Sequence, residues 1–258
     1  MTPDAIPEVT EDLFLEGRLR LLQPRRGHRA GTDAVLLAAT AEIRPGDHVV
    51  DLGSASGAVG LMAAIRVGAT RLSLVEREAI LVTLARRNIS SNGLEDRAAA
   101  YQADLFADRR TLRSAGLADG MADVVLTNPP FFEPGGRTSP DPGRRSAHVM
   151  EGGDLGRWVA SANWLLRPRG RIWMIHRADA LASCLEALRP TFGSIVVRPV
   201  YSKPGGAAAR LILSALKGGR TPLEVAAPIH LGEADAAADA ETKTVPAGGL
   251  PGPEKPDL

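Results

Sequence analysis

Residues 48–57 read HVVDLGSASG, an apolar stretch that runs into a glycine turn, and the helix-forming segment Ala58–Val67 follows it. Gly53 and Gly57 allow the backbone to adopt angles that a Cβ forbids and to approach a ligand closely. The start of the following helix adds free N–H groups. In open α/β sheets, ligands bind at this carboxyl edge of the strands. The stretch therefore predicts a strand, a ligand-binding turn and a helix.

The same alternation of strands and helices continues outward from this unit and predicts an α/β fold. The expected strands are His48–Leu52, Arg71–Glu76, Ala98–Gln102, Ala122–Thr127, Gly170–His176, Ser194–Val200 and Arg210–Ala215. The expected helices are Ala34–Ala41, Ala58–Val67, Glu78–Ser90, Leu155–Leu166 and Ala178–Leu188, with a shorter one near Asp108–Ala115. A Pro/Gly loop joins the last two strands, which favours an antiparallel hairpin. We expect a Rossmann-like, seven-stranded, mostly parallel sheet with an antiparallel last strand and helices on both faces.

The length of 258 residues suits one large α/β domain. We expect three segments. Residues 1–44 form a loose leader up to residue 12, a basic segment from Leu13 to Gln23 that is an edge hairpin or an extended arm, and a first helix capped by Thr32-Asp33. Residues 45–223 form the main domain. Residues 224–258 form an acidic tail with too little apolar content to order itself.

Composition narrows the class of protein. The single cysteine, Cys184, excludes an internal disulfide and fits a reducing compartment. No apolar run approaches the roughly 18 residues that span a bilayer, so we expect a soluble, cytoplasmic protein without a membrane partner. The net charge is +1, but the tail is acidic and the preceding body is therefore basic, which is compatible with a phosphate-bearing partner. The oligomeric state stays open.

Two ligand classes compete for the glycine turn. A dinucleotide site favours glycine at positions 53, 55 and 58, but Ala55 and Ala58 stand at two of them. The turn, with Asp51 before it, resembles instead the Asp/Glu-x-Gly-x-Gly-x-Gly loop of class I methyltransferases, which bind S-adenosylmethionine. Ala55 replaces the middle glycine of that pattern, and this leaves its backbone angles open.

Acidic residues end the next two strands as well, Glu76 and Asp104. A carboxylate at such a strand end can accept hydrogen bonds from two ribose hydroxyls. The resemblance implies that Glu76 binds the cofactor's ribose and that Asp104 binds its adenine amine. The set of cofactor-binding residues expected from the resemblance is Thr32, Asp33, Asp51, Gly53, Ser54, Gly57, Glu76, Asp104 and Asn128.

The strand Ala122–Thr127 ends in Asn128-Pro129-Pro130-Phe131, the most informative motif of the chain. Prolines fix φ and restrict the preceding residue, so Asn128 is held in one direction, and Phe131 offers a face for a planar base. The Asn128 side-chain oxygen and the Pro129 carbonyl can accept the two N–H bonds of a conjugated amine. Its lone pair then points toward the sulfonium methyl, so that catalysis consists of positioning and electrostatics. We expect these four residues to be catalytic.

The motif suits adenine N6, guanine N2, cytosine N4 and glutamine amides alike, so basic residues must indicate the substrate. Basic stretches with few or no acids suggest phosphate contacts. The residues expected to contact RNA are Arg25, Arg26, Arg29, Arg144, Arg145 and Lys203.

A closer resemblance covers about residues 10–220. Leu13–Leu37, with Gly31-Thr32-Asp33, and the run from Ile175 to Asp179 are similar to bacterial tRNA(Val) adenine N6-methyltransferases. This implies tRNA as partner and adenine N6 as target. The alternatives are a methyltransferase of ribosomal RNA, acting on adenine N6 or guanine N2, a protein glutamine N5-methyltransferase, a DNA adenine methyltransferase, and an RNA-binding module without catalysis. His148 and His176 lack metal-ligand spacing, so no metal is expected. Trp158, Trp164 and Trp173 are expected in the core.

Overall fold

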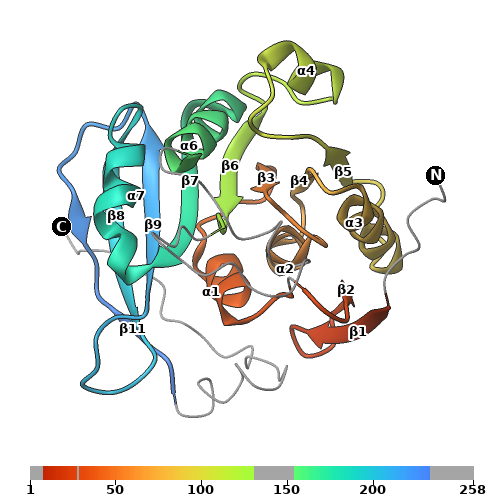
Figure 1. Ribbon diagram of the computed structural model, residues 1–258, viewed down its shortest axis with the longest axis horizontal. Coiled ribbons are helices and arrows are strands. Elements are labelled where there is room, and N and C mark those ends of the chain that lie inside the picture. The colour runs from red at the N-terminus through yellow and green to blue at the C-terminus, as the bar shows by residue number, and fades with distance from the viewer. Residues whose placement is uncertain (1–7, 28, 131–153, 233–258) are drawn as a thin grey trace.

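A computed structural model describes residues 8–27, 29–130 and 154–232. Its centre is a sheet in which the strand order is β5-β4-β3-β6-β7-β9-β8, with β10 and β11 beside β8 (Figure 1). The strands are β3 His48–Leu52, β4 Arg71–Glu76, β5 Ala98–Gln102, β6 Ala122–Thr127, β7 Leu166–Arg177, β8 Phe192–Tyr201, β9 Arg210–Lys217, β10 Glu224–Val225 and β11 Ile229–His230.

Only β9 runs against its neighbours in this sheet. It is antiparallel to both β7 and β8, whereas the pairs β3–β4, β3–β6, β4–β5 and β6–β7 are parallel. The short connection between β8 and β9 explains this direction, because parallel neighbours need a longer crossover. The predicted Rossmann-like, mostly parallel sheet with an antiparallel strand β9 is confirmed, but the sheet has nine strands instead of seven because β10 and β11 follow β9. Crossover helices place the carboxyl ends of the parallel strands at one edge.

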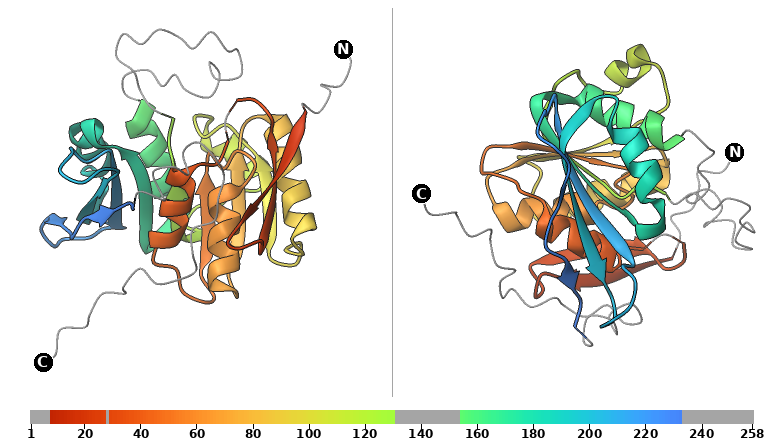
Figure 2. Two further views of the ribbon diagram at one scale, coloured as in Figure 1. Left: turned by 90° about the horizontal axis from the view of Figure 1, so that it is seen from below. Right: turned by 90° about the vertical axis from the view of Figure 1, so that its left-hand side faces the viewer.

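Helices cover both faces of the sheet, as predicted (Figure 2). On one face lie α1 Thr32–Thr40, α2 Ala58–Val67 and α3 Ala79–Ser91; on the other lie α4 Arg109–Ser114, α6 Asp154–Leu165 and α7 Leu181–Leu188. Neighbouring strand residues face opposite layers, since Val49 packs with the first set and Val50 with the second. The three tryptophans are buried in the core, which confirms their predicted location.

The N-terminal segment is a hairpin, which agrees with the hairpin alternative for Leu13 to Gln23 but begins earlier than expected. β1 Val9–Phe14 pairs antiparallel with β2 Leu19–Pro24. The leader prediction is therefore wrong for residues 9–12. Phe14, Leu19 and Leu21 are buried in the same core cluster as α1, α2 and α3, so the hairpin is an integral part of the domain.

The C-terminal prediction also needs correction. The segment from residue 224 was expected to be disordered, but β10 and β11 run parallel to β8 along its outer edge. The backbone N–H of Ala226 donates to the Val197 carbonyl, and that of Leu231 to the Tyr201 carbonyl, both at 2.9 Å. Pairing with an existing edge orders residues that have little apolar content of their own. Residues 233–258 lie outside the described part of the chain.

Two helix starts differ from expectation. Gly31, not the pair Thr32-Asp33, is the N-cap of α1, and the helix begins at Thr32. The expected helix 178–188 divides into the 3₁₀ turn η1 Ala178–Ala180 and α7. Within the described residues, no helix combines the length and the apolarity that a membrane span requires. Nor do three or more His, Cys, Asp or Glu side chains gather there in a group able to hold a metal ion.

Candidate active site

The glycine loop between β3 and α2 has left-handed backbone angles at three positions, with φ of +68° at Gly53, +48° at Ala55 and +95° at Gly57. A Cβ at Gly53 would lie 2.8 Å from the Trp158 ring, so this position requires glycine. Ala55 adopts the same region with its Cβ in place, which costs roughly 1 kcal/mol. The loop thus keeps the expected shape, and the missing middle glycine appears as local strain.

Backbone hydrogen bonds tie this loop to the end of β4. The N–H groups of Gly53 and Ser54 both donate to the Val75 carbonyl, at 2.9 and 3.1 Å. The Ala55 N–H donates to Glu76 Oε2 at 3.0 Å. Three successive residues of the loop are therefore held by the neighbouring strand, which stabilises its shape without a ligand.

Asp51 anchors the helix that follows the loop. Its carboxylate is 1% exposed, and its Oδ2 accepts the Gly60 N–H from the first turn of α2 at 2.8 Å. Burial raises the pKa of Asp51 to about 7, the Gly60 hydrogen bond opposes that rise, and the charge of Glu76 adds to it. Asp51 thus forms part of the wall of the site and fixes the direction of α2.

Glu76 lies at the end of β4, where the sequence placed it, and it is buried. Besides Ala55, it accepts the N–H groups of Arg77 and Glu78 on Oε1, at 2.8 and 2.9 Å. A carboxylate has about four lone-pair positions, so Oε2 retains acceptor capacity. This arrangement can hold a hydroxyl group of a ligand beside the loop.

A hollow lies between the loop, the start of α2 and the end of β6. The residues lining it are Ala30, Ala34, Asp51, Gly53, Ser54, Ala55, Ser56, Ala58, Val59 and Asn128. Two of its polar atoms, Ser54 Oγ and Asn128 Oδ1, are buried and have no hydrogen-bond partner within the described residues. Leaving such an atom unpaired costs roughly 1–3 kcal/mol. A polar ligand in the hollow satisfies both, so these residues fit a cofactor that carries hydrogen-bonding groups.

Thr127 and Trp158 fix the end of β6 that presents Asn128. The Thr127 hydroxyl donates to the Leu52 carbonyl at 3.1 Å and accepts the Trp158 indole N–H at 2.8 Å. The Trp158 ring also covers Gly53. The sequence assigned Trp158 to the core, which is correct, but missed that it supports both the loop and the motif. No spacing signal links Trp158 to either of them.

Several residues predicted to bind cofactor lie away from the lining of the hollow. Asp104 is exposed and accepts the Phe106 N–H at 2.9 Å. Thr32 and Asp33 stand between Ala30 and Ala34 in sequence, but only these two alanines line the hollow. Asp33 forms an ion pair with Arg210 at 2.9 Å, which joins α1 to β9. Gly57 and Glu76 are not among the lining residues either. The cofactor roles of all the predicted residues, inside and outside the lining, stay predictions.

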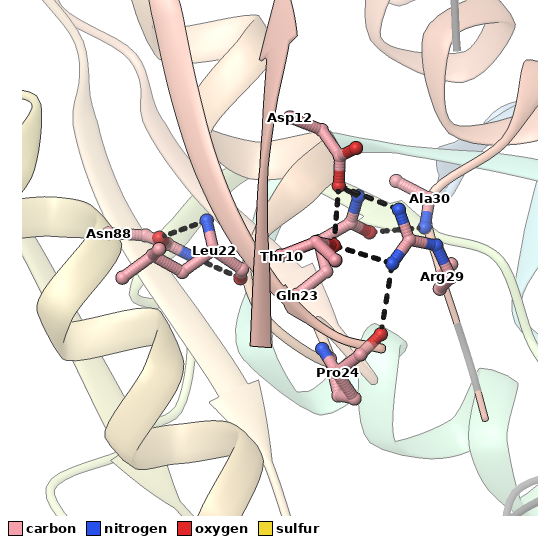
Figure 3. A network of polar contacts seen from close by, with 8 residues as sticks. All are labelled: Thr10, Asp12, Leu22, Gln23, Pro24, Arg29, Ala30 and Asn88. Carbon is pink, nitrogen blue, oxygen red and sulfur yellow. Dashed lines mark hydrogen bonds and ion pairs between the residues drawn. The ribbon is translucent and has the colours of Figure 1, made fainter. Parts of the chain in front are cut away.

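The residues expected to contact RNA fall into different settings. The Arg29 guanidinium bonds to Thr10, Asp12 and the Pro24 carbonyl, a network that fixes the loop after β2 (Figure 3). Arg25 forms an exposed ion pair with Glu8, and Arg26 and Lys203 are exposed. Phe131, Arg144 and Arg145 lie outside the described residues. Because the Arg29 guanidinium is engaged in this network, the exposed Arg25, Arg26 and Lys203 are the stronger candidates for RNA contact among the described residues.

Two buried amides near the site were not found from the sequence. Gln23 and Asn88 are both fully buried. Gln23 Oε1 accepts the N–H of Ala30, a lining residue, at 2.6 Å (Figure 3). Asn88 Nδ2 donates to the carbonyl of Ser56, another lining residue, at 2.9 Å. The only available signal was a polar residue within an otherwise apolar surrounding, which does not reveal a partner distant in sequence.

Comparison with known proteins shows that the chain is similar to methyltransferases. The sequence model of the family "Methyltransferase small domain" matches residues 30–199. The tRNA1(Val) (adenine(37)-N6)-methyltransferase of Porphyromonas gingivalis is 31% identical over 174 residues, which are 66% of this chain and 67% of that protein. The enzyme of the same name from Phocaeicola vulgatus is 29% identical, over 72% of this chain and 76% of its own.

A solved structure agrees with this. A predicted O-methyltransferase from Agrobacterium tumefaciens superposes with a TM-score of 0.65 at 25% identity, covering 81% of this chain and 96% of that one. The matched region contains the glycine loop, Glu76 and Asn128, together with strands β3 to β7 of the sheet. The protein therefore belongs to the methyltransferase small domain family and is an S-adenosylmethionine-dependent methyltransferase.

Proposed function

We propose that this enzyme methylates N6 of an adenine in tRNA. The observation that carries the proposal is the buried, unpartnered Oδ1 of Asn128 at the end of β6, in the wall of the same hollow as the glycine loop. An acceptor without a partner suits a ligand that brings N–H groups. The tRNA1(Val) adenine-N6 enzymes to which the chain is similar support the choice of adenine and of tRNA. A tRNA substrate leads us to expect the protein in the cytoplasm.

The proposed cofactor contacts follow the hollow. S-adenosylmethionine supplies an electrophilic methyl group on a positively charged sulfur. Gly53 and Ser54 line the hollow, and the Ser54 hydroxyl offers a buried hydrogen-bonding group without a partner among the described residues. Gly57 is proposed to contribute through its left-handed backbone, which shapes the loop. Glu76 accepts ribose hydroxyls through the lone pairs that Ala55, Arg77 and Glu78 do not occupy.

Asn128 and Pro129 position the acceptor nitrogen in this proposal. An exocyclic amine conjugated to adenine is a weak nucleophile because its lone pair is delocalised into the ring. Asn128 Oδ1 accepts one of its N–H bonds and the Pro129 carbonyl accepts the other, which favours a tetrahedral nitrogen with its lone pair free to attack. The methylated nitrogen then releases one proton to solvent. The protein contributes orientation and fixed dipoles instead of a strong base.

Contact with the RNA backbone is proposed for the exposed cations. Arg25, Arg26 and Lys203 carry charge at the surface of the described part, and Arg144 and Arg145 follow the Asn-Pro-Pro-Phe motif in sequence. Phe131 is proposed to stack on the flipped adenine. Phosphate contacts make binding weaken as salt rises, so the KM for RNA is expected to increase with ionic strength while cofactor affinity changes little.

The test is methylation with labelled cofactor. The purified protein is incubated with tRNA, ribosomal RNA, DNA and protein fractions from a strain that lacks its gene, and the products are digested to identify the methylated unit. The expected result is N6-methyladenosine in tRNA alone. Label in ribosomal RNA or in glutamine would show that the substrate is not tRNA. Binding of RNA without any transfer of label would favour a binding module over an enzyme.

A further inference from the structure

Asn88 on α3 and Asn92, the C-cap of that helix, bind the free edge of strand β2. Asn88 Oδ1 accepts the Leu22 N–H at 2.7 Å, and its Nδ2 donates to the Leu22 carbonyl at 3.0 Å. Asn92 binds the N–H and the carbonyl of Arg20 in the same way, at 2.9 and 2.8 Å. Residues four apart on a helix share a face, and residues two apart on a strand share an edge. The two side-chain amides thus replace a neighbouring strand.

Only Asn88 also contacts the glycine loop. The Nδ2 group of Asn88 donates at 2.9 Å to the carbonyl of Ser56, and this contact is fully buried. Both amide hydrogens of Asn88 therefore have acceptors, and its oxygen has a donor. Asn92 Nδ2 bonds instead to the Asn88 carbonyl at 2.7 Å, within its own helix. The bond to a lining residue of the hollow belongs to Asn88 alone; Asn88 is also fully buried, whereas Asn92 is partly buried.

Ser56 is a point at which the loop needs support. It lines the hollow and follows Ala55, the residue with the strained left-handed backbone. Glu76 holds the Ala55 N–H on one side, and Asn88 holds the Ser56 carbonyl on the other. A loop braced at two adjacent residues retains a strained turn that a free loop would release.

A second lining residue of the hollow, Ala30, is bonded to the same strand. Gln23, the residue after Leu22, accepts the Ala30 N–H, and its Nε2 donates to Asp12 at 2.8 Å (Figure 3). Ala30 and Ser56 both line the hollow. Strand β2 is therefore linked to two lining residues, to Ala30 through Gln23 and to Ser56 through Asn88.

We propose that Asn88 is a positioning residue for the cofactor site, which sets the Ser56 peptide group by hydrogen-bonding it to β2. This rests on the proposed cofactor site at the loop. Asn88 does not touch the cofactor in this account. Its role is to keep the glycine loop in the shape that receives the cofactor, so that binding does not have to order the loop.

The experiment compares Asn88→Ala with Asn92→Ala as matched variants. Both remove an amide that binds β2, and only the first removes the bond to Ser56. S-adenosylhomocysteine affinity is measured by calorimetry, and KM for S-adenosylmethionine and for tRNA by methyl transfer. We expect Asn88→Ala to lower cofactor affinity about tenfold or more and to raise the KM for cofactor but not for RNA. Asn92→Ala is expected to lower thermal stability while cofactor affinity stays within about twofold.

Equal loss of affinity in the two variants, or unchanged affinity in Asn88→Ala, would overturn the inference. If the wild-type protein binds no S-adenosylhomocysteine, the proposed cofactor site itself fails, which is a distinct result. If Asn88→Ala does not fold, ¹⁵N spectra of the side-chain amides of the wild-type protein test the inference. The signal that is missing from the spectrum of Asn92→Ala identifies Asn92, which serves as the control. The Asn88 resonance must shift on titration with S-adenosylhomocysteine more than that of Asn92; equal or absent shifts contradict the inference.

Discussion

The two sides of the hollow differ in how their polar groups are bonded. In the glycine loop, Gly53, Ser54 and Ala55 all donate to β4, and Ser56 accepts from Asn88. At the end of β6, Thr127 and Trp158 fix the backbone, but the side-chain oxygen of Asn128 has no partner in the described part of the chain. The loop's backbone is bonded without a ligand and only its Ser54 hydroxyl has no partner among the described residues, whereas the end of β6 lacks a donor for the side chain that it presents.

This difference separates two tasks. A loop that binds a cofactor has higher affinity when its backbone is already ordered, because the entropy of ordering is lost during folding and not during binding. An acceptor that binds a substrate amine must stay unpaired until that amine arrives. Changes in the loop are therefore expected to affect cofactor affinity and stability, whereas a change at Asn128 is expected to affect turnover.

Replacement of Asn128 by alanine is expected to have the largest effect. Asn128→Ala removes the unpaired acceptor and is predicted to lower kcat by about a hundredfold to a thousandfold, the range seen when one oriented hydrogen-bonding group is lost. Binding of S-adenosylhomocysteine, measured by calorimetry, is expected to persist. Asn163 is a suitable control, since its Oδ1 is also buried and unpartnered among the described residues but lies on α6 outside the lining. If Asn163→Ala also loses turnover, the loss in Asn128→Ala cannot be assigned to an acceptor in the hollow, and this prediction is contradicted.

The next largest effect is expected at Glu76. Glu76→Gln puts an NH2 group opposite one of the backbone N–H groups that the carboxylate now accepts, so the loop loses an anchor and the ligand loses an acceptor. We expect cofactor affinity to fall by about tenfold to a hundredfold, with one to two hydrogen bonds to a charged group lost. The neighbouring Glu78 is exposed and paired with Arg77, so Glu78→Gln is predicted to bind as the wild type does. A similar loss of cofactor affinity in both variants would show that the loss comes from the change in net charge and not from the position of Glu76.

Asp51 makes a pH-dependent contribution. Its pKa is raised from 3.8 to about 7 in the folded protein, so between these values the folded state binds more protons than the unfolded state. Stability then falls as pH rises through that window, at most by about 1.4 kcal/mol per pH unit. Asp51→Asn keeps an acceptor for Gly60 and cannot ionise. Urea unfolding across the window is expected to show the wild type losing stability relative to the variant as pH rises; parallel curves would contradict the raised pKa.

The smallest effect is expected at Ala55. Ala55→Gly supplies the residue that tolerates a φ of +48°, and relief of this strain is predicted to raise the free energy of unfolding by up to about 1 kcal/mol. Cofactor affinity is expected to change by less than about twofold, because the bonds from Glu76 and Asn88 still hold the loop. Thermal unfolding and calorimetry check the two quantities. A destabilised variant would show that the left-handed angle carries no strain.

The sequence predicted the parts that depend on local patterns. Strands β3 to β6 have the expected bounds because each is an apolar run ended by a turn or by a chemically distinct residue. The glycine loop, Glu76 and Asn128 follow from the same strand ends. Parts that depend on distant partners were not predicted. Asp33 binds Arg210, 177 residues away, and Asn88 binds Leu22 and Ser56; neither spacing nor periodicity encodes such pairs. The short strands β10 and β11 form only because β8 offers an edge.

The most direct test of the account is a crystal structure with S-adenosylhomocysteine, the product in which the sulfur has lost its methyl group. We predict the ligand in the hollow, with its ribose at Glu76 and its sulfur facing the side-chain oxygen of Asn128. An Asn128 side chain turned away from the sulfur, or a ligand bound outside the glycine loop, would contradict the proposal that these residues join cofactor and acceptor nitrogen.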